Sequence, residues 1–83
     1  MEAQQLTIGE LATRSGVAPS ALRFYEKVGL IRAERTSGNQ RRFERATLRR
    51  VAFVQAGKAA GIPLEQIRAA LETLPDDLGK SLQ

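Results

Sequence analysis

Apolar residues recur at helical spacing near the start of the chain. In "LTIGELATRSG" they fall on one face of a helix turn after turn. Thr7 and Glu10 have the spacing of an N-terminal capping box. Gly16 can adopt the left-handed backbone conformation that ends a helix. This pattern predicts a short helix over about residues 8–14.

A second helix is predicted over about residues 19–27. Pro19 stands where a first helical residue often does, and Leu22 and Tyr25 continue the apolar face. Two short helices joined by a glycine-bearing turn form a helix-turn-helix pattern, whose second helix can enter a DNA major groove. An αα-hairpin in an ordinary helical bundle has the same pattern, so the spacing alone leaves both interpretations open.

The pattern changes to strand-like alternation in "LIRAERTSGNQRRF", which predicts a β-hairpin over residues 30–43 with a Gly-Asn loop. Successive strand side chains point to opposite faces, so Arg41 and Arg42 cannot both contact the same kind of partner. We expect one to meet phosphate while the other packs or pairs with an acid such as Glu26 or Glu44. The alternative is two solvated strand arginines.

Two further helices are predicted, over about residues 45–60 and 64–73, with Pro75 stopping the last one. Gly57 weakens the interior of the first of these by about 1 kcal/mol relative to Ala, without a reason visible in the sequence. The apolar face of the first is expected to be core and comprises Leu48, Val51, Ala52, Gln55 and Ala59. The corresponding face of the second comprises Leu64, Ile67, Ala70, Leu71 and Leu74.

Composition narrows the class of protein. Eighty-three residues suffice for one small domain, and the absence of cysteine rules out disulfides and thiolate metal sites in this chain. No apolar run approaches the roughly 18 residues of a membrane span, so we expect a soluble cytoplasmic domain without membrane contact. An enzyme is the weakest candidate, because histidine, cysteine and a phosphate-cradling glycine loop are all missing.

Charge is distributed unevenly. The formal net charge is +4, but residues 14–50 contain ten Lys or Arg against three Glu, a local net charge of +7. A basic block of this kind indicates a polyanionic partner, most often nucleic acid, or else a solvated face that only aids solubility.

The motifs together resemble a known family. Three stretches are similar to the N-terminal DNA-binding domain of MerR-family bacterial transcription regulators, and their sequence is nearest to the SoxR branch. They are "TIGELATRSGVAPSALRFYEKVGLI", "SGNQRRF" and "GIPLEQIRAAL". The resemblance implies a mainly α winged helix-turn-helix domain over residues 5–74. Within it, the helix-turn-helix spans 8–27, a two-stranded wing spans 30–43, and a helix pair spans 45–60 and 64–73.

The resemblance also implies DNA contacts. These would come from the recognition helix, the wing and the third helix, through Ser20, Arg23, Tyr25, Asn39, Gln40, Arg41, Arg42 and Arg49. For Tyr25, a core ring whose hydroxyl reaches only water is an equal alternative. Phe24 lacks a hydroxyl where many relatives have Tyr and is expected to pack rather than donate. Ala18 and Pro63 replace common capping serines and offer no capping oxygen.

Finally, the resemblance implies partners beyond this chain. Such regulators bind palindromic promoters in the cytoplasmic nucleoid as homodimers and distort the promoter spacer for RNA polymerase. Relatives continue into a dimerisation helix, and the SoxR branch carries an iron–sulfur cluster there, so no cofactor is expected in this chain. Residues 75–83 are then a tail or the start of a missing dimerisation segment. A truncated fragment, which would be monomeric or weakly dimeric, is favoured over a single-domain protein.

Two other functions stay open at this point. One is an excisionase-like architectural DNA-binding protein, since small recombination proteins use a similar winged helix. The other is a protein-interaction module whose basic half docks an acidic partner.

Overall fold

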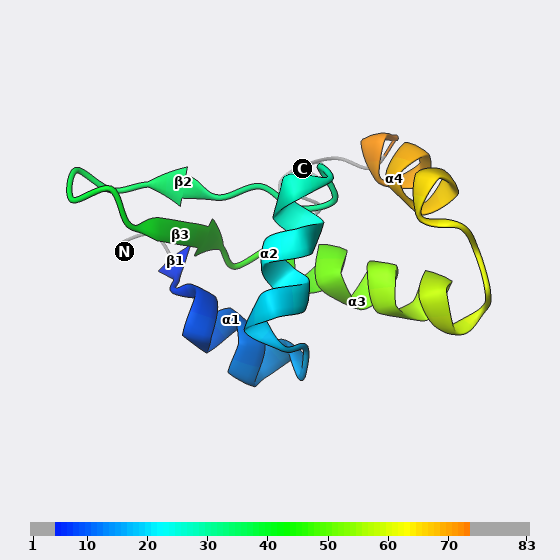
Figure 1. The fold of residues 1–83 in the computed structure, drawn as a ribbon, viewed down its shortest axis with the longest axis horizontal. Helices are drawn as coiled ribbons and strands as arrows, with labels where there is room; N and C mark the ends of the chain where they lie inside the picture. Colours follow the sequence, from blue (N-terminus) through cyan, green and yellow to red (C-terminus); the bar gives the residue numbers. More distant parts are fainter. Residues whose placement is uncertain (1–4, 74–83) are drawn as a thin grey trace, which may run out of the picture.

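The structure is a computed structural model that describes residues 5–73. Four helices and a small sheet make up a mainly α winged helix-turn-helix (Figure 1). The elements, in chain order, are β1 (Gln5–Leu6), α1 (Ile8–Ser15), α2 (Pro19–Lys27), β2 (Glu34–Arg35), β3 (Arg41–Glu44), α3 (Thr47–Ala59) and α4 (Leu64–Glu72). The predicted fold class is therefore confirmed.

The sheet has one strand more than predicted. Its order is β1-β3-β2, and both pairings are antiparallel. Gln5 pairs with Glu44 and Leu6 pairs with Phe43, so the start of the described chain covers the outer edge of β3. A strand of two residues is too short to show alternation, so β1 could not be predicted from the apolar pattern.

The helix-turn-helix forms from the predicted local signals. The Thr7 side chain accepts a hydrogen bond from the Glu10 backbone, and the Glu10 carboxylate accepts one from the Thr7 backbone N–H. Gly16 ends α1 with φ 76°, in the left-handed region that glycine adopts without strain. Pro19 opens α2, and Ala18 before it provides no side-chain cap, as expected.

One core joins the helix-turn-helix, the sheet and the second helix pair. Tyr25 of α2 and Phe43 of β3 are the largest fully buried side chains. The buried apolar residues are Leu6, Leu11, Val17, Leu22, Tyr25, Leu30, Ile31, Phe43, Val51, Val54, Ile67 and Leu71. Because these residues come from nearly every element, the recognition helix and the wing are held in a fixed relation.

The predicted buried face of α3 was partly wrong. Thr47, Val51, Val54 and Gly57 are buried, whereas the predicted core positions at Ala52, Gln55 and Ala59 are exposed. The helix also begins at Thr47 rather than at residue 45. Alanine and glutamine do not by themselves determine which side of a helix is buried. Because α4 packs against α3, the buried side is the adjacent face, which carries Val54 and Gly57.

Gly57 allows α3 and α4 to approach closely. A Cβ atom at this position would lie 2.7 Å from Ile67 Cδ1 and 2.9 Å from Ile67 Cγ1. The helix-weakening glycine thus has a packing reason. On α4, Ile67 and Leu71 are buried as predicted, while Leu74 and Pro75 lie outside the described residues.

Candidate nucleic-acid interface

The outward face of α2 is polar and cationic. Leu22 and Tyr25 point into the core, which leaves Ser20, Arg23 and Lys27 exposed on the other side. Among residues 5–73, Arg23 has no hydrogen-bond or ion-pair partner. Its guanidinium is therefore available to an acceptor outside the chain, such as a base edge or a phosphate.

The wing ends in a tight, well-bonded turn. The Asn39 N–H donates to the Thr36 carbonyl at 2.8 Å, and Asn39 itself has φ 64°. The Thr36 hydroxyl accepts from the Gly38 and Gln40 backbone N–H groups, each at 3.2 Å. The residue in the left-handed conformation is thus Asn39 rather than Gly38, which fits a three-residue hairpin loop. Asn39 and Gln40 are both exposed there.

Arg41 and Arg42 take different roles, as the strand alternation predicted. Arg41 Nε lies 2.7 Å from Glu26 Oε1, in an ion pair that joins β3 to α2. Arg42 has no acidic partner among the described residues, and its guanidinium donates to the Gln40 side chain at 3.0 Å and to the Arg41 carbonyl at 2.9 Å. The pairing with Glu26 is confirmed, and Arg42 keeps its charge uncompensated.

Tyr25 is a core residue with a bonded hydroxyl. The residue is 2% exposed, its hydroxyl donates to Gln55 Oε1 at 2.8 Å, and Lys58 Nζ donates to the same hydroxyl at 3.0 Å. The Lys58 ammonium lies 5.4 Å from the ring centre, so its main contact is with the hydroxyl rather than the ring face. Burial of the ring favours the core interpretation that the sequence left open.

Phe24 was expected to pack rather than donate, and it packs only in part, with its ring against that of Tyr25. The side chain is 46% exposed on α2. Helical periodicity places residue 24 away from the inward-facing Leu22, so the core has no room for it.

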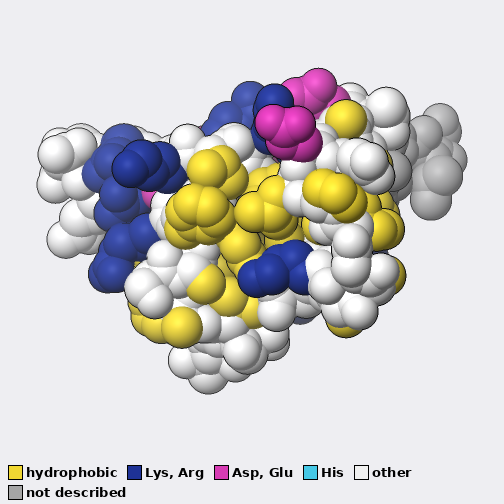
Figure 2. Space-filling view, turned by 45° about the vertical axis from the view of Figure 1, so that its right-hand side comes forward, with side chains coloured by type: hydrophobic (Ala, Val, Ile, Leu, Met, Phe, Trp, Pro, Cys, Tyr) yellow, Lys and Arg dark blue, Asp and Glu magenta, His cyan; other side chains and the backbone are white. Residues whose placement is uncertain are grey.

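The site residues thus form one joined group and one separate member. The Arg41–Glu26 ion pair joins the start of β3 to α2, and its two side chains are 35% and 22% exposed. Arg49 is exposed on α3, outside that joined pair of elements. Figure 2 shows many of the Lys and Arg side chains at one end of a molecular face, others at its upper edge and near its centre, and hydrophobic side chains across the middle.

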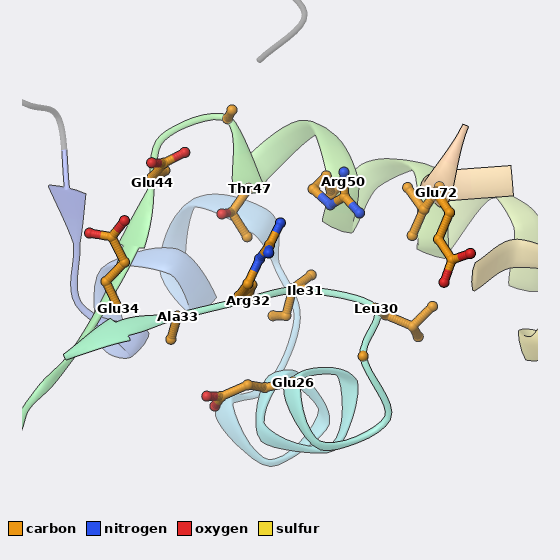
Figure 3. A pocket seen from close by; sticks show the side chains of 13 residues that line it. Glu26, Leu30, Ile31, Arg32, Ala33, Glu34, Glu44, Thr47, Arg50 and Glu72 are labelled. Carbon is orange, nitrogen blue, oxygen red and sulfur yellow. The ribbon is translucent and has the colours of Figure 1, made fainter. Parts of the chain in front are cut away.

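A hollow of about 870 Å³ opens elsewhere, between the segment after α2, the start of α3 and the end of α4 (Figure 3). Four carboxylates and two guanidinium groups line it, from Glu26, Glu34, Glu44, Glu72, Arg32 and Arg50. Two of the four carboxylates are already paired, Glu26 with Arg41 and Glu72 with Arg68.

Comparison with known proteins accords with this geometry. The model of the MerR HTH family of regulatory proteins matches residues 6–74. The chain belongs to the MerR family. The matched region covers nearly all of the described residues.

Individual MerR relatives point the same way. A SoxR homolog of Chromobacterium violaceum, named as an HTH-type transcriptional activator, is 51% identical over 90% of this chain and 51% of its own length. The transcriptional regulator ZntR of Escherichia coli is 38% identical over 77% of this chain and 46% of its own. These relatives are regulators rather than enzymes. The chain spans about half the length of the curated relatives it matches.

A solved MerR structure gives the spatial comparison. HiNmlR, a MerR family regulator lacking the sensor domain and bound to promoter DNA, superposes with a TM-score of 0.76 at 30% identity, covering 83% of this chain and 53% of that one.

Sequence reasoning missed several supporting residues. Thr36 organises the wing turn, and Gln55 and Lys58 hold the Tyr25 hydroxyl. For Thr36 a signal existed, since Ser and Thr often cap turns with their hydroxyls. For Gln55 and Lys58 none did, because their contact with α2 depends on tertiary packing.

Among residues 5–73 there is no cluster of three potential metal ligands and no helix long and apolar enough to cross a bilayer.

Proposed function

We propose that this chain binds promoter DNA as the DNA-reading part of a transcription regulator. The outward face of α2, with Ser20 and Arg23, enters the major groove, while the wing sets Arg42 against a backbone phosphate. The observation that carries the proposal is the difference between the two wing arginines. Arg41 forms an ion pair with Glu26, whereas Arg42 has no acidic partner among the described residues. Base contacts then choose sequence and phosphate contacts fix register.

The remaining predicted contacts have supporting roles in this proposal. Asn39 and Gln40 lie exposed at the wing tip, where their amides can donate to phosphate oxygens, and Gln40 also orients Arg42. Arg49 would meet backbone beyond the major-groove contact. The Tyr25 hydroxyl, already engaged by Gln55 and Lys58, acts by orienting α2 unless one of those bonds is exchanged for a phosphate.

We further propose that this domain acts within a homodimer on a palindromic promoter in the nucleoid of the cytoplasm. There it distorts the promoter for RNA polymerase, as the SoxR-like resemblance implies. Duplex binding by the present segment needs no cofactor, because side chains carry all of its contacts. The proposal places no iron–sulfur cluster on these residues.

The test is a salt series of duplex binding by fluorescence anisotropy. The probes are a duplex enriched from a random-sequence library by this chain and a duplex of scrambled sequence. Arg42→Ala is expected to weaken binding to both and to reduce the slope of log K against log salt by about 0.9, the value for one lost phosphate contact. Arg68→Ala, which removes an equal charge from α4, is the matched control and should leave the slope unchanged.

An equal effect of the two substitutions would show only a general charge effect and contradict the proposed clamp. Binding by the unaltered chain that does not weaken with salt would contradict a polyanionic partner altogether.

A further inference from the structure

Phe24 is a large apolar side chain exposed on the recognition helix. Single exposed apolar residues are common and need no special explanation. The position of Phe24 within α2, however, separates it from an arbitrary surface residue.

A helix turns by about 100° per residue. On that geometry Ser20, Arg23, Phe24 and Lys27 occupy an arc of about 100°, directly opposite the buried Leu22 and Tyr25. Phe24 therefore shares the face that, under the proposed function, meets the bases.

The ring is also positioned rather than free. Its centroid lies 6.3 Å from that of Tyr25, with an angle of 56° between the rings, which is a tilted aromatic contact. Because Tyr25 is fixed in the core, this contact gives Phe24 a restricted set of orientations. A preorganised ring loses less conformational freedom when a partner covers it.

The surroundings indicate what that partner is. Arg23 is adjacent in sequence and Lys27 lies within the same arc, both exposed. A protein surface covering Phe24 would have to desolvate these cations, whereas duplex DNA presents anionic phosphates and acceptor base edges to them. The apolar group that the major groove presents is the 5-methyl of thymine.

We propose that Phe24 contacts a thymine 5-methyl group in the bound half-site and is a specificity-determining residue. This inference rests on the proposed function, in which α2 lies in the major groove. Next to that thymine, Arg23 donates two hydrogen bonds to a purine edge or a phosphate. Arg23 and Phe24 thus recognise one polar and one apolar feature of neighbouring base pairs.

The test is a uracil scan. In the duplex enriched from the random library, each thymine is replaced singly by deoxyuridine, which removes the 5-methyl and leaves base pairing intact. The unaltered chain is expected to lose about fourfold in affinity at one thymine position of the half-site, the factor for burying one methyl group. Phe24→Ala should bind more weakly and lose that sensitivity, while Phe24→Leu should keep part of it.

Val28→Ala is the matched control, because Val28 is an exposed apolar residue directly after the end of α2 and outside the arc. It should retain the uracil sensitivity of the unaltered chain. Circular dichroism confirms that each variant is folded, and the exposure of Phe24 makes loss of folding unexpected.

Equal affinity for all deoxyuridine duplexes, a selected site without thymine, or unchanged sensitivity in Phe24→Ala would overturn this inference. Any of these results, with salt-dependent binding and the Arg42→Ala effect intact, leaves the proposed function standing. Failure of the unaltered chain to bind duplex overturns both.

Discussion

Replacing Gly57 by alanine sets two opposing effects against each other. Alanine in a helix interior is favoured over glycine by about 1 kcal/mol. The new Cβ, however, would lie 2.7 Å and 2.9 Å from two atoms of Ile67, which is itself 2% exposed and has little room to move. Overpacking of this kind costs about 1–3 kcal/mol. We therefore expect a net loss of about 0–2 kcal/mol in the free energy of unfolding.

Urea denaturation followed by circular dichroism measures this change. Gly9→Ala is the matched control, because Gly9 lies in α1 and its Cβ would meet only Thr7 Oγ1 at 3.9 Å. That substitution should gain about 0.5–1 kcal/mol from helix propensity alone.

A second variant tests the cause. Ile67→Val removes the atom nearest to the added Cβ and alone costs about 0.5–1.5 kcal/mol. Combined with Gly57→Ala, it should cost less than the sum of the two single changes, because the overlap is relieved. If Gly57→Ala stabilises the chain as much as Gly9→Ala does, the close approach of α3 and α4 is refuted.

Three further predictions concern single contacts. Ala18→Ser should raise the free energy of unfolding by about 1 kcal/mol, since α2 has no side-chain cap; an unchanged urea midpoint would count against this. Glu26→Gln and Arg41→Ala should show a coupling of about 0.5–1 kcal/mol in a double-mutant cycle of stability, because their ion pair is partly exposed; additive losses would disprove it. Tyr25→Phe should cost about 1 kcal/mol by removing the hydrogen bond to Gln55, and thermal unfolding that matches the parent chain would contradict that bond.

The sequence predicted best the elements that are specified by local chemistry. Helix ends are marked through backbone preferences and neighbouring side chains by Thr7 with Glu10, by Gly16 and by Pro19. In the structure a helix begins or ends at each of these positions. The opposite orientation of Arg41 and Arg42 likewise depends only on the two-residue repeat of a strand.

Features that depend on tertiary packing escaped prediction. The buried side of α3 is set by where α4 packs, and alanine-rich positions such as Ala52 fit either side of a helix. The role of Gly57 becomes visible only when Ile67 is placed against it. β1 consists of two residues whose strand character comes from pairing with β3.

The site shows the same division. Ser20, Arg23, Asn39 and Gln40 are exposed where the family motif puts them, whereas Arg41 and Arg42 are half-buried and Arg41 pairs with Glu26. Sequence spacing could name Glu26 as one possible partner and could not choose it over Glu44. Phe24 was expected to pack because it lacks a hydroxyl, and its place on the outer arc of α2 was not considered.

The central claim is that α2 and the wing bind one duplex together. Nuclear magnetic resonance titration of the ¹⁵N-labelled chain with the enriched duplex tests it directly. Amide shifts are predicted to change together at residues 20–27 and 39–42, with small changes where α3 and α4 line the hollow, at Thr47, Arg50, Leu71 and Glu72. Shift changes confined to the hollow, or to only one of the two elements, would contradict the claim.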